Sequence, residues 1–189
     1  MKRRSFLRTA ASIIPAAGLH DFIAMQAAAQ SPSAPSQDSV QVVGAGEDRD
    51  GHTHTLGFSS IAFKVSASET GGALFIIEHS HLTAGGPALH MHLYQEEWFY
   101  VMEGKVAFLV GEQRVELGPG ESVYAPRRVR HTFAAISATP SRMLIAFCPA
   151  GKMEQFFRDS ATAKPDADMT EVFRHYDMRF LGPNPLLKS

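Results

Sequence analysis

The 189-residue sequence predicts an all-β fold, a β-sandwich or barrel, with short helices near the C-terminus. Short apolar runs alternate with turn residues between Phe58 and Cys148, and glycines and prolines separate these runs. After Gly151 the spacing of apolar residues becomes helical. Many short strands separated by regular turn signals are typical of a sandwich or barrel. We therefore expect a β domain over residues 57–149 and a helical segment with a tail over residues 150–189.

The expected strands are runs of β-branched, aromatic and other apolar residues, which favour a pleated and half-buried surface. They are 58–65, 73–79, 98–102, 106–110, 114–117, 122–124, 131–136 and 143–148. Cys148 ends the last run, and we expect it to be buried as a small hydrophobic residue. It is the sole cysteine, so an internal disulfide is excluded.

Two helices are expected after the β domain, over residues 151–160 and 168–175. Both segments place methionine and phenylalanine at the three- and four-residue spacing of one helix face. We expect this face to make ordinary core contacts, with both helices packed outside the barrel. Residues 181–189 contain two prolines and are expected to form a loose tail.

Three histidines and one glutamate form a candidate metal site. In a strand, the side chains at positions i and i+2 point to the same face, so His90 and His92 would aim at one point. A mixed set of imidazole nitrogens and a carboxylate suits transition metals and fits Ca or Mg poorly. The expected cofactor is one divalent transition metal, Mn, Fe, Ni, Co or Cu rather than Zn. The expected ligands are His90, His92, Glu97 and His131.

The sequence contains an internal control, because His-x-His occurs three times, at 52–54, 79–81 and 90–92. Only the third is followed by a glutamate five residues later and by a Gly…Pro…His segment. An isolated His-x-His is usually a surface or core feature. His79 and His81 could line the approach to the site, but a polar strand face is at least as good an explanation.

These residues resemble the two conserved motifs of the cupin superfamily. His90, His92, Glu97 and Gly104 match the first motif, and Gly120, Pro126 and His131 match the second. Arg128 stands where the second motif usually has glycine. The resemblance implies a double-stranded β-helix, the cupin jelly roll. Within the superfamily, the stretch 97–100 is similar to single-domain proteins described as quercetin 2,3-dioxygenase-like.

The N-terminal 29 residues are expected to be a twin-arginine signal peptide. Arg3 and Arg4 lie in a twin-arginine pattern, followed by a modestly apolar stretch and by Ala27-Ala28-Ala29 before Gln30. The apolar stretch is too short to span a membrane. We therefore expect export by the twin-arginine machinery to the periplasm or outside the cell. Residues 30–56 would form a linker and an N-terminal arm.

The charge balance excludes nucleic acid as an expected partner. The chain has 18 basic and 19 acidic residues, and removal of residues 1–29 takes away four basic residues and one acidic residue. The remaining net charge of about −4 provides no basic surface for phosphates. The expected partners are a small-molecule substrate, joined by O₂ in the case of an oxygenase, and a second copy in a homodimer. Trp98 and Tyr100 are expected to face away from the metal and could form this interface.

Three classes of function stay open. The first, favoured here, is a metal-dependent dioxygenase acting on a flavonol-like or other enolisable compound, with Glu97 as ligand or catalytic base. This substrate class is implied by the resemblance alone. The second is a metal-dependent isomerase, epimerase or lyase, and the third is a non-catalytic binding module. Apolar candidates for the barrel interior favour the first class: Ile77, Phe99, Val101 and Phe133. The basic segment 127–130 is expected to be a solvated loop, with a position at the mouth of the site as the alternative.

Overall fold

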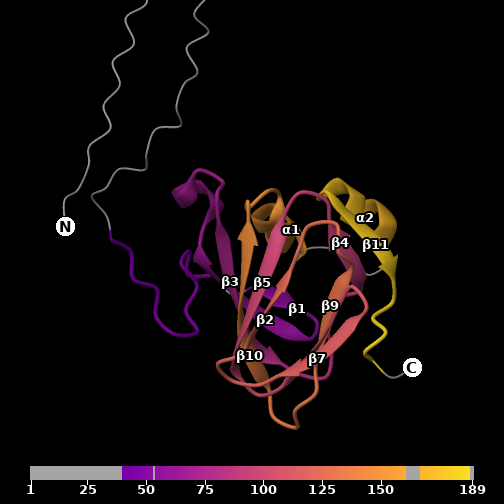
Figure 1. Cartoon of the computed structure of the whole chain (residues 1–189). Coiled ribbons are helices and arrows are strands. Elements are labelled where there is room, and N and C mark those ends of the chain that lie inside the picture. The colour runs from indigo at the N-terminus through magenta and orange to yellow at the C-terminus, as the bar shows by residue number, and fades with distance from the viewer. Residues whose placement is uncertain (1–39, 53, 161–166, 188–189) are drawn as a thin grey trace, which may run out of the picture. The chain divides into compact units, whose positions relative to one another are not determined.

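The computed structural model describes residues 40–52, 54–160 and 167–187, and these form two antiparallel sheets with short helices (Figure 1). One six-stranded sheet contains, in order, β1 (His54–Leu56), β2 (Ser59–Val65), β3 (Phe75–Leu82), β10 (Ser141–Cys148), β5 (Glu96–Glu103) and β8 (Ser122–Ala125). The five-stranded sheet contains β11 (Met178–Gly182), β4 (Leu89–His92), β9 (His131–Ala135), β6 (Val106–Val110) and β7 (Gln113–Leu117). The helices are the 3₁₀ turn η1 (Ala67–Thr70), α1 (Met153–Ser160) and α2 (Met169–His175). The expected all-β jelly roll with C-terminal helices is confirmed.

The core lies between the two sheets, because alternate residues of each strand point inward. In β5, Glu97, Phe99 and Val101 are buried, while Trp98 between them is exposed. Strand β10 follows the same alternation and buries Phe147 beside Glu97. Burial of one such aromatic side chain contributes about 1.5 to 3 kcal/mol, so these inward rows hold the layers together.

The alternation of β10 corrects the expectation for Cys148. Phe147 points into the core, so the next residue points outward, and Cys148 is exposed. The apolar run 143–148 looked continuous in the sequence, but only every second side chain in it can face the core.

Three strands lie outside the apolar runs expected from the sequence. Strand β4 was expected only from the two-residue spacing of His90 and His92, and β1 falls in the segment expected to be linker and arm. Strand β11 follows α2 and extends two residues into the expected tail. Strand β11 pairs with β4, placing Met178 opposite His92 and Phe180 opposite His90. The last strand of the chain therefore supports the strand that contributes two of the expected ligands.

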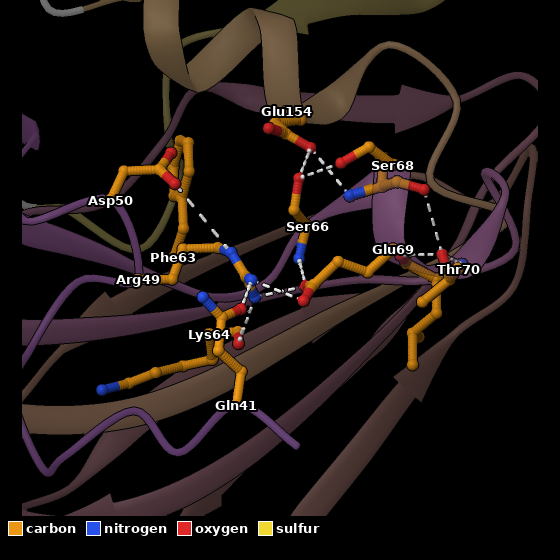
Figure 2. A network of polar contacts seen from close by, with 12 residues as sticks. Gln41, Arg49, Asp50, Phe63, Lys64, Ser66, Ser68, Glu69, Thr70 and Glu154 are labelled. Carbon is orange, nitrogen blue, oxygen red and sulfur yellow. Dashed lines mark hydrogen bonds and ion pairs between the residues drawn. The ribbon is translucent and has the colours of Figure 1, made fainter. Parts of the chain in front are cut away.

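A network of charged and polar side chains ties α1 to the N-terminal part of the domain (Figure 2). Glu154 accepts hydrogen bonds from the Ser66 hydroxyl at 2.8 Å and from the Ala67 backbone N–H at 2.7 Å. Arg158 donates to Glu154 and to Asp50, both at 2.6 Å. One helix face is thus fixed by charge-assisted hydrogen bonds to the segments before β1 and after β2.

Stability should depend on the charge of Glu154. Burial raises the pKa of this carboxyl, but hydrogen bonds from Arg158, Ala67 and Ser66 outweigh burial and hold the pKa below its usual value. Because the folded pKa is the lower one, this stabilisation is complete above the unfolded pKa and is lost as the pH falls through the folded value. Glu154→Gln should cost about 1 to 3 kcal/mol at pH 7, and progressively less in acid. Urea unfolding between pH 7 and pH 3 measures this difference.

The matched control is Glu171→Gln on α2, where an exposed glutamate pairs with Arg174 three residues later. Exposed pairs contribute about 0 to 1 kcal/mol, so this change should be close to neutral at every pH. Equal effects of the two substitutions would contradict the anchoring role of Glu154.

The loop before β4 should not tolerate a side chain at position 86. A Cβ atom added to Gly86 would lie 1.8 Å from the Phe133 carbonyl oxygen, which no side-chain rotation can relieve. Gly86→Ala should therefore cost about 1 to 3 kcal/mol of unfolding free energy, as overpacking does. The control is Gly57→Ala, because a Cβ atom there would meet nothing within 4 Å. Denaturant unfolding that shows the same stability for both variants would refute this packing argument.

Candidate metal centre

The four expected ligands come together from three strands and both sheets. Strand β4 contributes His90 and His92, β9 contributes His131, and β5 of the opposite sheet contributes Glu97. His90 and His131 are register partners across the β4–β9 pair. One donor atom from each of the four side chains lies within 4.8 Å of the others, and all four side chains are buried. The expected constellation is therefore present as a compact cluster.

Glu97 lies at the centre of the cluster. Its Oε2 atom is 2.8 Å from Nε2 of His131 and 3.1 Å from Nε2 of His92. The contact with His92 is close enough for a hydrogen bond but is not aligned as one. Both ring nitrogens of His92 are therefore buried without a hydrogen-bond partner among the described residues. A buried unpaired nitrogen is costly unless some other group satisfies it.

Backbone carbonyls fix the ring orientation of the other two histidines. Nδ1 of His90 lies 2.8 Å from the Ala88 carbonyl, and Nδ1 of His131 lies 2.9 Å from the Val129 carbonyl. Each Nδ1–H donates to a carbonyl, so in the neutral ring Nε2 presents its lone pair to the cluster. Such outer hydrogen bonds are typical of metal-binding histidines.

The donor set fits a bound cation. A neutral His131 would direct the Nε2 lone pair at the Glu97 carboxylate, and the nitrogens of His92 are left unsatisfied. A divalent transition metal among these atoms would satisfy the carboxylate and the imidazoles together. Three imidazoles and one carboxylate match the ligand preferences of Mn, Fe, Co, Ni, Cu and Zn.

The protonation equilibria show how strongly these groups interact. Burial raises the pKa of Glu97, but the nearby His131 and His92 outweigh burial and hold it well below its usual value. Burial lowers the pKa of His131, yet the hydrogen bond and charge of Glu97 raise it above its usual value. Burial and the charges of the other two histidines hold the pKa of His90 well below its usual value. The carboxylate charge is therefore available to a bound cation at neutral pH.

A cavity of about 310 Å³ opens onto the ligands. His90, His92 and Glu97 line one part of it, and most of the remaining wall is aromatic or aliphatic. Of the four residues expected to form an apolar cavity, Phe133 does line it, whereas Ile77, Phe99 and Val101 are buried in the packed core. The inward side chains of β5 that follow Glu97, Phe99 and Val101, pack against other core side chains, so the cavity does not extend to them.

The two C-terminal helices form part of the cavity wall, which corrects the expectation that they pack only on the outside. Phe156 and Phe157 of α1 and Phe173 of α2 line the cavity, and these rings contact one another. Apolar residues at helical spacing look the same in sequence whether they face a packed core or a binding cavity. No feature of the sequence distinguished these two cases.

The basic segment 127–130 lies outside the cavity wall, in agreement with the expected solvated loop. Arg127 pairs with Glu96, and Arg130 pairs with Glu112. Arg128 has a positive φ of 63°, in the left-handed region that glycine favours, at the position where the resembled motif has glycine. Its backbone N–H donates to the His92 carbonyl at 2.7 Å, so this turn is tied to the ligand strand.

Two aromatic side chains lie on the outward face of β5. Trp98 and Tyr100 stack on each other with ring centroids 5.7 Å apart, and Trp98 is exposed, so the outward orientation is confirmed. The homodimer expected at this face stays a prediction.

The twin-arginine signal peptide expected over residues 1–29 lies outside the described residues. Within the described part of the chain, no helix is long and apolar enough to cross a membrane.

Removal of a ligand should release the metal. His92→Ala and His131→Ala should lose most of a content of about one metal ion per chain and should lower the melting temperature, because bound metal stabilises the folded state. His79→Ala should retain the metal, since His79 lies in the cavity wall but outside the ligand cluster. Elemental mass spectrometry of protein purified without chelator measures the content. Loss of metal from the His79 variant but not from the His92 variant would show that the ligands are misassigned.

Comparisons with known proteins agree with this architecture. Residues 78–147 match the family model described as a cupin domain. Quercetin 2,3-dioxygenase from Bacillus subtilis is 28% identical over 95 residues, which are 50% of this chain and 28% of that protein. An uncharacterized protein of Methanocaldococcus jannaschii is 28% identical over 61 residues, which are 32% of this chain and 49% of that protein. The matches thus span less than half of the length of either curated relative.

The solved structure of the polyketide cyclase RemF from Streptomyces resistomycificus has the same fold. It superimposes with a TM-score of 0.50 at 18% identity and covers 58% of this chain and 80% of its own. At this identity the likeness concerns the fold alone. The domain match, the two-sheet jelly roll and the buried histidine and glutamate cluster support the cupin superfamily, with residues 78–147 as the cupin domain.

Proposed function

We propose that this protein is a metal-dependent dioxygenase that acts on a flavonol-like or other enolisable aromatic small molecule. The observation that carries the proposal is the apolar cavity that ends at the metal ligands. Its volume of about 310 Å³ suits a small molecule, since such sites commonly occupy about 300 to 1,000 Å³. The similarity to quercetin 2,3-dioxygenase over half of this chain supports the same class.

The expected ligand residues would have two roles, which are to bind the metal and to accept a proton. His90, His92 and His131 would hold one divalent transition metal, with their rings oriented by backbone carbonyls. The bound metal would supply a Lewis acid and, when redox-active, a route for electrons between substrate and O₂. Glu97 is ionised at neutral pH, because its pKa lies below the usual value. Its carboxylate can therefore complete the ligand set or accept the proton of an enolic hydroxyl placed beside it.

The aromatic wall would orient the substrate and exclude water. Rings of Phe133, Phe156, Phe157 and Phe173 line the cavity around the ligands. Offset and edge-to-face contacts with such rings favour a planar aromatic ligand. An isomerase, epimerase or lyase of a polar metabolite would need several polar groups in this wall, whereas most lining residues are apolar.

Export by the twin-arginine route remains part of the proposal. The support is the arginine pair and the small residues before Gln30. Metal analysis is therefore most informative on protein recovered from its native compartment. Mn, Fe, Co, Ni or Cu in that protein would agree with an oxygenase, whereas Zn alone would favour the isomerase and lyase class.

Oxygen uptake tests the proposal directly. Metal-loaded protein should consume O₂ when a flavonol is added, and Glu97→Gln should slow this uptake by about 100-fold or more, because a positioned base is lost. The control is Glu96→Gln, which removes the adjacent carboxylate that pairs with Arg127. That variant should retain the uptake rate and the metal.

Two results would overturn the dioxygenase proposal. Conversion of the substrate without O₂ consumption would assign the site to the isomerase, epimerase or lyase class. Binding of a flavonol by metal-loaded protein without any conversion would leave a binding module. An unchanged rate in Glu97→Gln would remove the proton-accepting role of that residue.

A further inference from the structure

Besides the expected ligands, a further buried histidine lies in the wall of the cavity. His79 on β3 is 2% exposed and lines the cavity together with His90 and Glu97. It does not belong to the ligand cluster. Strand β10 separates β3 from β5, and Met143 on β10 pairs with both His79 and Val101, a residue four positions after Glu97. His79 therefore comes from the same sheet face as Glu97, but from a different row and a different strand.

The surroundings of His79 are apolar. The preceding inward residues of β3 are Phe75 and Ile77, and both are fully buried. The imidazole ring meets Phe133 and Phe157 edge-on, with ring centroids 5.7 Å and 6.3 Å apart. Burial of a polar ring costs free energy unless its nitrogens are hydrogen-bonded, whereas an aliphatic residue here would pack without that cost. The imidazole thus needs polar partners on both of its nitrogens.

Among the described residues, one such partner is present, and it contacts Nδ1. Nδ1 of His79 lies 3.2 Å from the hydroxyl oxygen of Ser59, a buried residue at the start of β2. This contact fixes the ring. No described residue hydrogen-bonds Nε2, the other ring nitrogen. In the wall of a cavity, that nitrogen is available to a ligand.

The ring is uncharged at neutral pH. Burial lowers the pKa of His79 to about 3, against a weaker opposing effect of the Glu97 charge. A neutral imidazole donates one hydrogen bond and accepts one, and the Ser59 hydroxyl can take either role. Nε2 can therefore face a hydroxyl or a carbonyl group. A carboxylate or phosphate would instead need a charged partner.

We propose that His79 is a substrate-positioning residue, which hydrogen-bonds a neutral hydroxyl or carbonyl group at the end of the aromatic substrate remote from the metal. This inference rests on the proposed function, because it takes the enolic end of the substrate to face Glu97. The rings of Phe133 and Phe157 would then contact the remote aromatic ring beside His79. The substrate class narrows to aromatic compounds with polar groups at both ends.

Binding of two flavonols without O₂ tests this inference apart from turnover. Galangin and kaempferol differ by one hydroxyl, at the far end of the phenyl ring that is attached beside the enol. Metal-loaded wild-type protein should bind kaempferol about 3- to 10-fold more tightly, the effect of one hydrogen bond. His79→Leu should abolish this preference, and His79→Gln should restore part of it. Fluorescence quenching under argon measures the dissociation constants, and the metal content should stay unchanged.

Two further variants serve as control and as second test. His81→Leu changes an exposed histidine on the same strand and should keep the preference. Ser59→Ala removes the hydroxyl that fixes the ring and should weaken the preference even if His79→Leu does not fold.

The outcomes separate this inference from the dioxygenase proposal. Equal affinity of the wild type for both flavonols, failure to bind either, or a preference that survives in His79→Leu would overturn the role of His79. A preference that depends on His79, without O₂ uptake on admission of air, would support the positioning role and refute the dioxygenase.

Discussion

The contact between the Glu97 carboxylate and the imidazoles of the opposite sheet is the constraint on which the rest of the structure depends. A carboxylate that leaves water costs several kcal/mol unless opposite charge and hydrogen bonds replace the solvent. Here Glu97 extends from β5 toward His131 and His92, which belong to the other layer. The registers of β5 with β10 and of β4 with β9 must therefore be correct together, because a one-residue slip would turn the ligands away.

The buried cluster of three histidines and one glutamate could be predicted from the sequence. A two-residue spacing in a strand fixes the common direction of His90 and His92, and the two-motif pattern links Glu97 and His131 to them. The β-rich architecture followed from the alternation of short runs and turns. The strand spacing and the alternation of runs and turns depend on strand geometry, which is the same in every fold. The link to His131 came from the motif resemblance, because its contact with the other residues is made only in the folded structure.

The parts that could not be predicted depend on tertiary contacts. Residues of α1 and α2 have the spacing of any amphipathic helix, and only the position of these helices makes Phe157 and Phe173 part of a binding cavity. His79 looked like one member of a repeated His-x-His pattern, and its burial beside Phe133 separates it from the exposed His81. Strand β11 is a short segment whose partner, β4, lies far away in the sequence.

The pairing of β11 with β4 has a consequence for the order in which the protein matures. Strand β4 meets β9 at a single register pair, whereas β11 pairs with it at four positions. The strand that holds His90 and His92 is thus secured mainly by residues 178–182, which follow His131, the last of the four expected ligands, in the sequence. During synthesis these residues leave the ribosome after all four expected ligands. A growing chain that already contains the four side chains therefore lacks the main partner of β4 until β11 has been added.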